Sequence, residues 1–185
     1  MFNKEANVFF ETYSGSAEKV KKLQDRSERY DWELCRCSPF SKEPVNNEEF
    51  VYRQAPSPLF YDSLTGKLTP TAFDEVFNRG CSVDRESHAS IDEIYQRGFE
   101  RVKKYNAENP EKPERIFSAV AKLSCAEVRS HVLNGVRSMG IYDTALEENR
   151  SHAEICQLSQ PSKASKRSIR SHLFSIAQTL TLQAD

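Results

Sequence analysis

The sequence predicts a single compact α+β domain with a small mixed or antiparallel sheet of short strands, two central capped helices, and helical N- and C-terminal segments. The length of 185 residues is typical of one domain with its own core. Short β-branched and aromatic runs recur through the middle of the chain and indicate strands. Two Ser-x-x-Glu sequences mark helix starts between these runs.

The composition indicates a folded protein without a general attraction to nucleic acid or membranes. Apolar residues make up 38% of the chain, and eleven Phe, seven Tyr and one Trp are available for a core. The net charge is −1, so an anionic partner would have to meet a local basic patch. The sequence contains no apolar run near the ~18 residues of a membrane span, and its N-terminal residues do not resemble a signal peptide. We therefore expect a cytoplasmic protein with no membrane partner.

The cysteines indicate reduced thiols. They are odd in number and irregularly spaced: Cys35, Cys37, Cys81, Cys125 and Cys156. Cys81 and Cys156 lie in apolar runs, where we expect buried, unreactive side chains. A zinc site would need Cys35 and Cys37 to be completed by distant residues, since the sequence has no second closely spaced ligand pair. We predict no metal and no cofactor.

The segment 1–48 is predicted to be a helical arm leaning on the main body. Its thin apolar stripe consists of Val20, Leu23, Tyr30 and Trp32. A polar loop that contains Pro44 connects this arm to the central α+β domain, 49–157.

The central domain opens with a predicted strand, 50–54, that Pro56 and Pro58 end. The segment 63–67 is a predicted turn. A short strand, 79–84, is predicted next and is entered through Gly80.

Ser90 and Glu93 have the spacing of a capping box, and the helix that follows is expected to end near Asn109. The next predicted strand is 115–123. Ser124 and Glu127 form a second capping box, and the helix they open is predicted to stop at 134–135, an Asn-Gly pair.

Two further short strands are predicted at 140–144 and 152–156, joined by a charged turn. The final segment, 158–185, is a predicted basic amphipathic helix. Its apolar stripe consists of Ile169, Leu173, Ile176 and Leu180, and its positive residues near the start are Lys163, Lys166, Arg167 and Arg170.

Three polar residues lie within separate apolar strands: Arg53, Ser82 and Glu154. Their order resembles the ADP-ribosyltransferase fold. In that family, an arginine holds a cofactor phosphate, a serine lies near the nicotinamide, and a glutamate engages the ribose as positive charge develops. The resemblance implies an enzyme using NAD. The simpler interpretation is that polar residues alternate along half-exposed strands.

His152 points to the same side of its strand as Glu154, so the two residues are candidates for an acid and base pair. A pair of Cys81 and His152 is a further candidate nucleophile and base. Alternatively, His152 is a buried histidine that is hydrogen-bonded to a neighbour.

The four positive residues of the C-terminal helix lie where the helix dipole disfavours them unless an anion is near. They are candidate contacts for nucleic acid or an acidic protein partner. The alternative is a solvated polar face opposite a packed stripe.

Several landmarks together resemble a group of small uncharacterised bacterial proteins. They are Tyr52-Arg53-Gln54, Ala72-Phe73, Cys81-Ser82-Val83-Asp84-Arg85 and His152-Ala153-Glu154-Ile155. The resemblance implies a bacterial cytosolic protein, and by analogy a member of a defence or toxin gene cassette.

The leading functional hypothesis is an accessory or regulatory protein that binds a partner protein, because common catalytic motifs are missing from the sequence and both terminal stripes need a surface to pack on. The alternatives are an ADP-ribosyltransferase-like enzyme and a nucleic-acid-binding protein. Whether the protein is an enzyme stays open, with a non-enzymatic role favoured.

Overall fold

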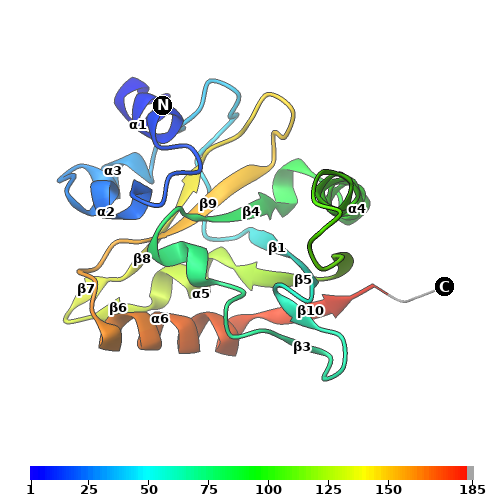
Figure 1. Ribbon diagram of the computed structural model, residues 1–185. Coiled ribbons are helices and arrows are strands. Elements are labelled where there is room, and N and C mark those ends of the chain that lie inside the picture. The colour runs from blue at the N-terminus through cyan, green and yellow to red at the C-terminus, as the bar shows by residue number, and fades with distance from the viewer. Residues whose placement is uncertain (183–185) are drawn as a thin grey trace.

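The computed structural model describes residues 1–182 and confirms the predicted α+β class. Figure 1 shows a twisted sheet with helices on both faces. The helices are α1 (Lys4–Thr12), α2 (Lys19–Gln24), α3 (Arg29–Trp32), α4 (Ile91–Glu108), α5 (Cys125–Ser130) and α6 (Lys163–Ile176). Two 3₁₀ helices are η1 (Asp74–Phe77) and η2 (Glu86–His88). The last three residues of the predicted C-terminal segment, 183–185, lie outside the described range.

The main sheet has six strands in the order β10-β5-β1-β4-β9-β8, and every neighbouring pair is antiparallel. Its strands are β1 (Phe50–Ser57), β4 (Cys81–Arg85), β5 (Ile116–Ser124), β8 (Met139–Asp143), β9 (His152–Gln157) and β10 (Gln178–Thr181). Two small hairpins pair β2 (Tyr61–Asp62) with β3 (Lys67–Leu68), and β6 (Val132–Leu133) with β7 (Val136–Arg137). Of the two predicted alternatives, the sheet is therefore antiparallel.

One face of the sheet is mostly apolar, although Arg53, Arg85 and Asp143 also belong to it. Val51, Val83 and Ile155 belong to this face, since residues of a strand alternate between the two faces. They pack against Ile169 and Leu173 of α6, which are completely buried. Helices α5 and α6 together cover this side of the sheet (Figure 1).

The opposite face is covered in two separate places. Helix α4 places Ile94 on Tyr52, over β1 and β5. Helices α1 to α3 place Phe10 and Leu23 on Tyr142, at the β8–β9 end of the sheet. Figure 1 shows the two helical groups apart from each other above the sheet. The polar residues of β4 and β9 lie between them.

Both terminal stripes pack within the chain itself. Val20, Leu23 and Trp32 of the N-terminal arm are buried in one cluster with Tyr142. Within residues 1–182, none of the helices combines the length and apolar character needed to cross a membrane.

Three predicted element boundaries are wrong. Pro56 does not end β1, because a shift of register between Ala55 and Pro56 accommodates the proline within the strand. Asn134 and Gly135 do not end a long helix: α5 stops at Ser130, and the two residues form the tight turn between β6 and β7 with φ values of 52° and 78°.

The third wrong boundary concerns Leu180. It does not lie on the terminal helix, because α6 ends at Ile176 and Leu180 pairs with Val120 across β10 and β5.

Candidate functional site

A cavity of about 510 Å³ lies between the N-terminal arm and the polar residues of β4 and β9. Three of the predicted site residues line it: Ser82, His152 and Glu154. Gly80 and Lys19 line it as well. Such a volume is in the range of small-molecule sites in proteins.

Strand pairing brings the three residues together. Ser82 on β4 lies directly opposite Glu154 on β9, and Asp84 lies opposite His152. Because directly opposed residues point to the same face, Ser82, His152 and Glu154 form a compact polar group on that face. The predicted shared side of His152 and Glu154 is confirmed.

Glu154 forms a buried ion pair with Lys19 of α2. The Lys19 Nζ atom donates to both carboxylate oxygens, at 2.6 and 2.8 Å. The side chains are 2% and 9% exposed, so the pair is largely removed from water. Glu154 is therefore a carboxylate with a fixed counter-ion rather than a free base.

Gly80 makes room for this carboxylate. A Cβ atom at this position would lie 2.7 Å from Oε2 of Glu154, and φ of Gly80 is +81°. Both the contact and the backbone conformation require glycine. The backbone at Gly80 therefore leaves no room for a side chain beside the Glu154 carboxylate.

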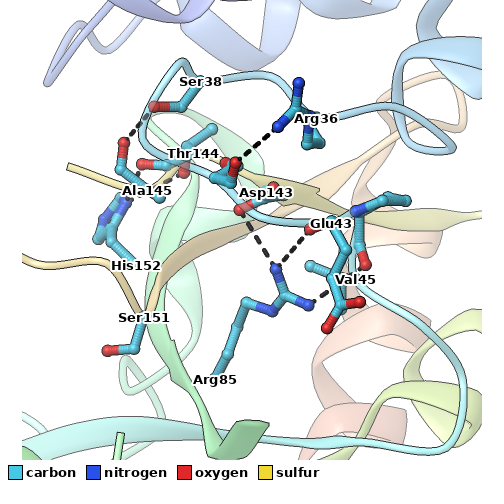
Figure 2. Close-up of polar contacts among 12 residues, drawn as sticks. Arg36, Ser38, Glu43, Val45, Arg85, Asp143, Thr144, Ala145, Ser151 and His152 are labelled. Atoms are coloured by element: carbon cyan, nitrogen blue, oxygen red, sulfur yellow. Dashed lines mark hydrogen bonds and ion pairs between the residues drawn. The ribbon is translucent and has the colours of Figure 1, made fainter. Parts of the chain in front are cut away.

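His152 is oriented by the loop between β8 and β9. Its Nδ1 atom lies 2.9 Å from the Thr144 carbonyl oxygen and 3.0 Å from the Thr144 hydroxyl (Figure 2). A carbonyl can only accept, so Nδ1 carries the proton and Nε2 holds the lone pair in the neutral ring. Within residues 1–182, Nε2 has no protein hydrogen-bond partner.

The same loop is held in place from the N-terminal side. The Ser38 hydroxyl donates to the Ala145 carbonyl at 2.5 Å, as Figure 2 shows. This bond links the chain before β1 to the residue next to Thr144. The position of the His152 ring therefore depends on contacts from both sides of the cavity.

Arg53 lies next to this group and lines a smaller cavity of about 210 Å³. Its guanidinium pairs with Glu75 at 2.5 Å and donates to the Ser82 carbonyl at 3.1 Å. Ser82 and Glu75 line both cavities, which are therefore adjacent. Of the four predicted residues, three share one cavity and Arg53 lies in the next.

Asp84 is a residue that the sequence analysis missed. It is only 4% exposed, and its carboxylate accepts hydrogen bonds from four side chains. The donors are Gln54, Arg97, Asn149 and Ser151, at 2.8 to 3.0 Å. Asn149 and Ser151 belong to the segment just before β9. Asp84 therefore fixes the segment that leads into His152.

Cys81 is not a partner of His152. The pairing of β4 and β9 places the two residues on opposite faces of the sheet. Cys81 is completely buried, and burial raises the pKa of its thiol to about 11, so the thiolate form is disfavoured. In the part of the chain that the structure describes, no three His, Cys, Asp or Glu side chains are placed to hold a metal ion.

The basic residues at the start of α6 are not all free. Arg170 pairs with Asp74 at 2.6 Å, so the acidic compensation missing from the helix sequence comes from η1. Lys166 lies over the Phe77 ring, 5.6 Å from its centroid. Lys163 and Arg167 are exposed. The predicted basic patch is therefore smaller than the sequence indicated.

The site thus combines a shaped cavity, an oriented imidazole, a hydroxyl and a buried ion pair. Exposed carboxylates of Glu11, Glu147 and Glu148 lie at the same cavity. Comparison with known proteins found no family model that matches the chain, and no similar curated protein or solved structure.

Proposed function

We propose that this protein is an enzyme that binds a small polar molecule in the cavity above β4 and β9, with His152 as the group that accepts and returns a proton. The observation that carries the proposal is the state of His152. Its Nδ1 atom is committed to Thr144 while its other nitrogen has no partner in residues 1–182, and the side chain lines the cavity. An oriented imidazole of this kind is suited to general acid and base catalysis.

The neighbouring residues have distinct roles in this proposal. Ser82 offers a hydroxyl for hydrogen bonding to the ligand, since it lines the cavity on the same sheet face. Glu154 and Lys19 act as a fixed pair of charges that orients the ligand without exchanging protons. The proton therefore moves at His152 rather than at Glu154.

The proposal is tested by ligand-observed NMR with a panel of nucleosides, nucleotides, sugar phosphates and amino acids. We expect at least one compound to bind the wild type and its turnover to fall about 100-fold or more in His152→Asn. Ser82→Leu, which fills the cavity, is expected to abolish binding. His172→Asn, a histidine on α6, is the matched control and should keep both properties. The proposal fails if no compound binds, or if binding survives in Ser82→Leu.

A second candidate is ADP-ribosyl transfer from NAD. It is favoured by one observation: Ser82 on β4 lies directly opposite Glu154 on β9, and Arg53 belongs to the adjacent strand β1. Strand alternation, however, directs Arg53 to the other face of the sheet, the face of Val51 and Val83. Against it, the Glu154 carboxylate is held by Lys19 and would have to be released to engage a ribose. Release of nicotinamide from NAD by the wild type, and its loss in Glu154→Gln, would support this candidate. Stable NAD would reject it.

An accessory role in a partner complex was the leading hypothesis from the sequence. It relied partly on two apolar stripes in need of a surface, and the chain itself buries both. The stripes therefore no longer argue for a partner. Recovery of a stable partner in a pull-down from the native cell remains the direct test of this role.

Nucleic-acid binding through α6 depends on the exposed Lys163 and Arg167, since Arg170 pairs with Asp74. Phosphate contacts release counter-ions. Any affinity for nucleic acid should therefore fall steeply with salt, and an affinity indifferent to salt would reject this role.

A further inference from the structure

Three arginines from different elements line the smaller cavity of about 210 Å³. They are Arg53 of β1, Arg101 of α4 and Arg115, the residue before β5. Arg53 is 4% exposed and its charge is compensated by Glu75. Arg101 and Arg115 form no ion pair with any carboxylate in residues 1–182. The cavity therefore has an excess of positive charge.

Arg101 is brought to the cavity by the close packing of α4. A Cβ atom at Gly98 would lie 2.5 Å from the Phe117 ring, so only glycine allows this approach of helix to sheet. Arg97, one turn before Arg101, is engaged with Asp84 and Ser151. Arg101 is thus the arginine of α4 that is left without such partners.

Arg115 is also oriented before any ligand arrives. Its guanidinium carbon lies 3.4 Å from the centroid of the Tyr105 ring. Stacking on an aromatic face restricts the guanidinium plane and leaves its N–H groups free to donate at the edge.

We infer that this cavity binds the anionic group, a phosphate or a carboxylate, of the ligand whose remainder occupies the larger cavity. The inference rests on the proposed function: the two cavities lie side by side, with Ser82 and Glu75 in the lining of both, and the ligand would have to reach from one to the other past the Arg53–Glu75 ion pair. Guanidinium groups bind phosphate and carboxylate oxygens through paired hydrogen bonds. The substrate class is therefore an acidic small molecule.

Charge also fixes the direction of the ligand. The larger cavity has the exposed carboxylates of Glu11, Glu147 and Glu148 at its lining, and they outnumber the exposed cation there, Arg79, so an anion is disfavoured. The arginines lie at the other end of the combined site. The anionic group consequently enters the arginine cavity, and the uncharged or cationic part faces His152.

The experiment measures binding of inorganic phosphate, and separately of acetate, by isothermal titration calorimetry at low ionic strength. We expect saturable binding of phosphate that weakens at least tenfold in the double variant Arg101→Gln/Arg115→Gln. Lys163→Gln, an exposed cation on α6, is the matched control and should bind like the wild type. Tighter binding of phosphate than of acetate would identify a phosphate ligand, and the reverse order a carboxylate.

The result that would overturn the inference is the absence of saturable binding of both anions, or equal binding in the double variant and the control. Arg101 is exposed, so its change should leave the fold intact, and the melting temperature of each variant checks this. Turnover separates the two proposals. Saturable phosphate binding by a wild type that turns over no panel compound, or whose turnover is unchanged in His152→Asn, leaves the anion site standing while the proposed catalysis fails.

Discussion

Gly80 has a left-handed backbone conformation and lies close to the Glu154 carboxylate. Each of these two features should make replacement of the glycine destabilising. Its φ is +81°, and an added Cβ would meet Oε2 of Glu154 at 2.7 Å. We expect Gly80→Ala to lower the free energy of unfolding by about 2 kcal/mol or more, because strain and steric displacement add. Urea denaturation monitored by fluorescence measures this loss.

Gly15 provides the control for this substitution. It also has a positive φ, +67°, but an added Cβ would have no atom within 4 Å. Gly15→Ala should therefore cost only the backbone term, about 1 kcal/mol. Equal losses in the two variants would show that the contact with Glu154 does not contribute.

Arg85 makes the stability of the protein depend on pH in a defined way. Its side chain is completely buried, and it donates to Glu49 at 2.9 and 3.1 Å and lies 3.3 Å from Asp143. Figure 2 shows Arg85 directed at Asp143 from β4. Burial alone would raise the pKa of Glu49, but hydrogen bonds from Arg85 and Ser87 outweigh it and lower the pKa below 4.5. For Asp143, burial prevails and raises the pKa above 3.8.

The two carboxylates therefore act in opposite directions. Since Glu49 has a lower pKa folded than unfolded, its contribution is present above about pH 4.5 and is lost as pH falls through the folded pKa. Asp143 instead binds its proton more tightly when folded, so its ionised form lowers stability at neutral pH. We expect Glu49→Gln to lose about 2 kcal/mol at pH 7, and less at pH 4, because the carboxyl of the unfolded chain begins to bind its proton below about pH 4.5.

Asp143→Asn is the matched variant and should lose less at pH 7 than Glu49→Gln does. Urea unfolding at both pH values measures each change. A larger loss in Asp143→Asn would contradict the assignment of Glu49 as the main partner of Arg85.

At the scale of single elements, α4 depends on its N-terminal cap. The Ser90 hydroxyl accepts from the Glu93 amide, and the Glu93 carboxylate accepts from the Ser90 amide at 2.7 Å. We expect Ser90→Ala to reduce the free energy of unfolding by about 1 kcal/mol, because the Glu93 amide loses its acceptor. Ser90→Asp keeps an acceptor and should stay close to the wild type. Chemical denaturation compares the two, and an equal loss in both would refute the role of the cap.

Elements with local signals could be predicted from the sequence, and those decided by distant partners could not. The capping box of Ser90 acts within a few residues, so the start of α4 is correctly predicted. Asn134 and Gly135 favour positive φ, which suits both a helix end and a hairpin turn. Leu180 continued the helical spacing of α6, yet pairing with β5 recruits it into a strand.

For the whole molecule, thiol reactivity reports on the integrity of the fold. Cys35 is partly exposed, while Cys37, Cys81, Cys125 and Cys156 are buried. Burial raises the pKa of Cys125 to about 12 and that of Cys81 to about 11, which disfavours the reactive thiolate. We expect a native sample to react with a thiol reagent at Cys35 alone, and at all five after unfolding. Fast labelling of Cys81 in the native state would contradict this packing.

The sequence predicted only those site residues that are polar and lie within otherwise apolar strands. Ser82, His152 and Glu154 stood out because they interrupt apolar strands, and the sheet then brings them together. Lys19 lies among other lysines in a charged stretch, and its pairing with Glu154 depends on a contact across 135 residues of sequence. No local pattern carries that information.

That contact has a consequence for how the chain is made. Lys19 and Gln24 of the N-terminal arm find their partners on β9 and just beyond it, more than a hundred residues later in the sequence. As the polypeptide leaves the ribosome, Phe10 has no Tyr142 to pack on and Lys19 has no Glu154 to pair with until most of the chain has been synthesised. The lining of the cavity above β4 and β9 is therefore complete only after β9 has emerged from the ribosome.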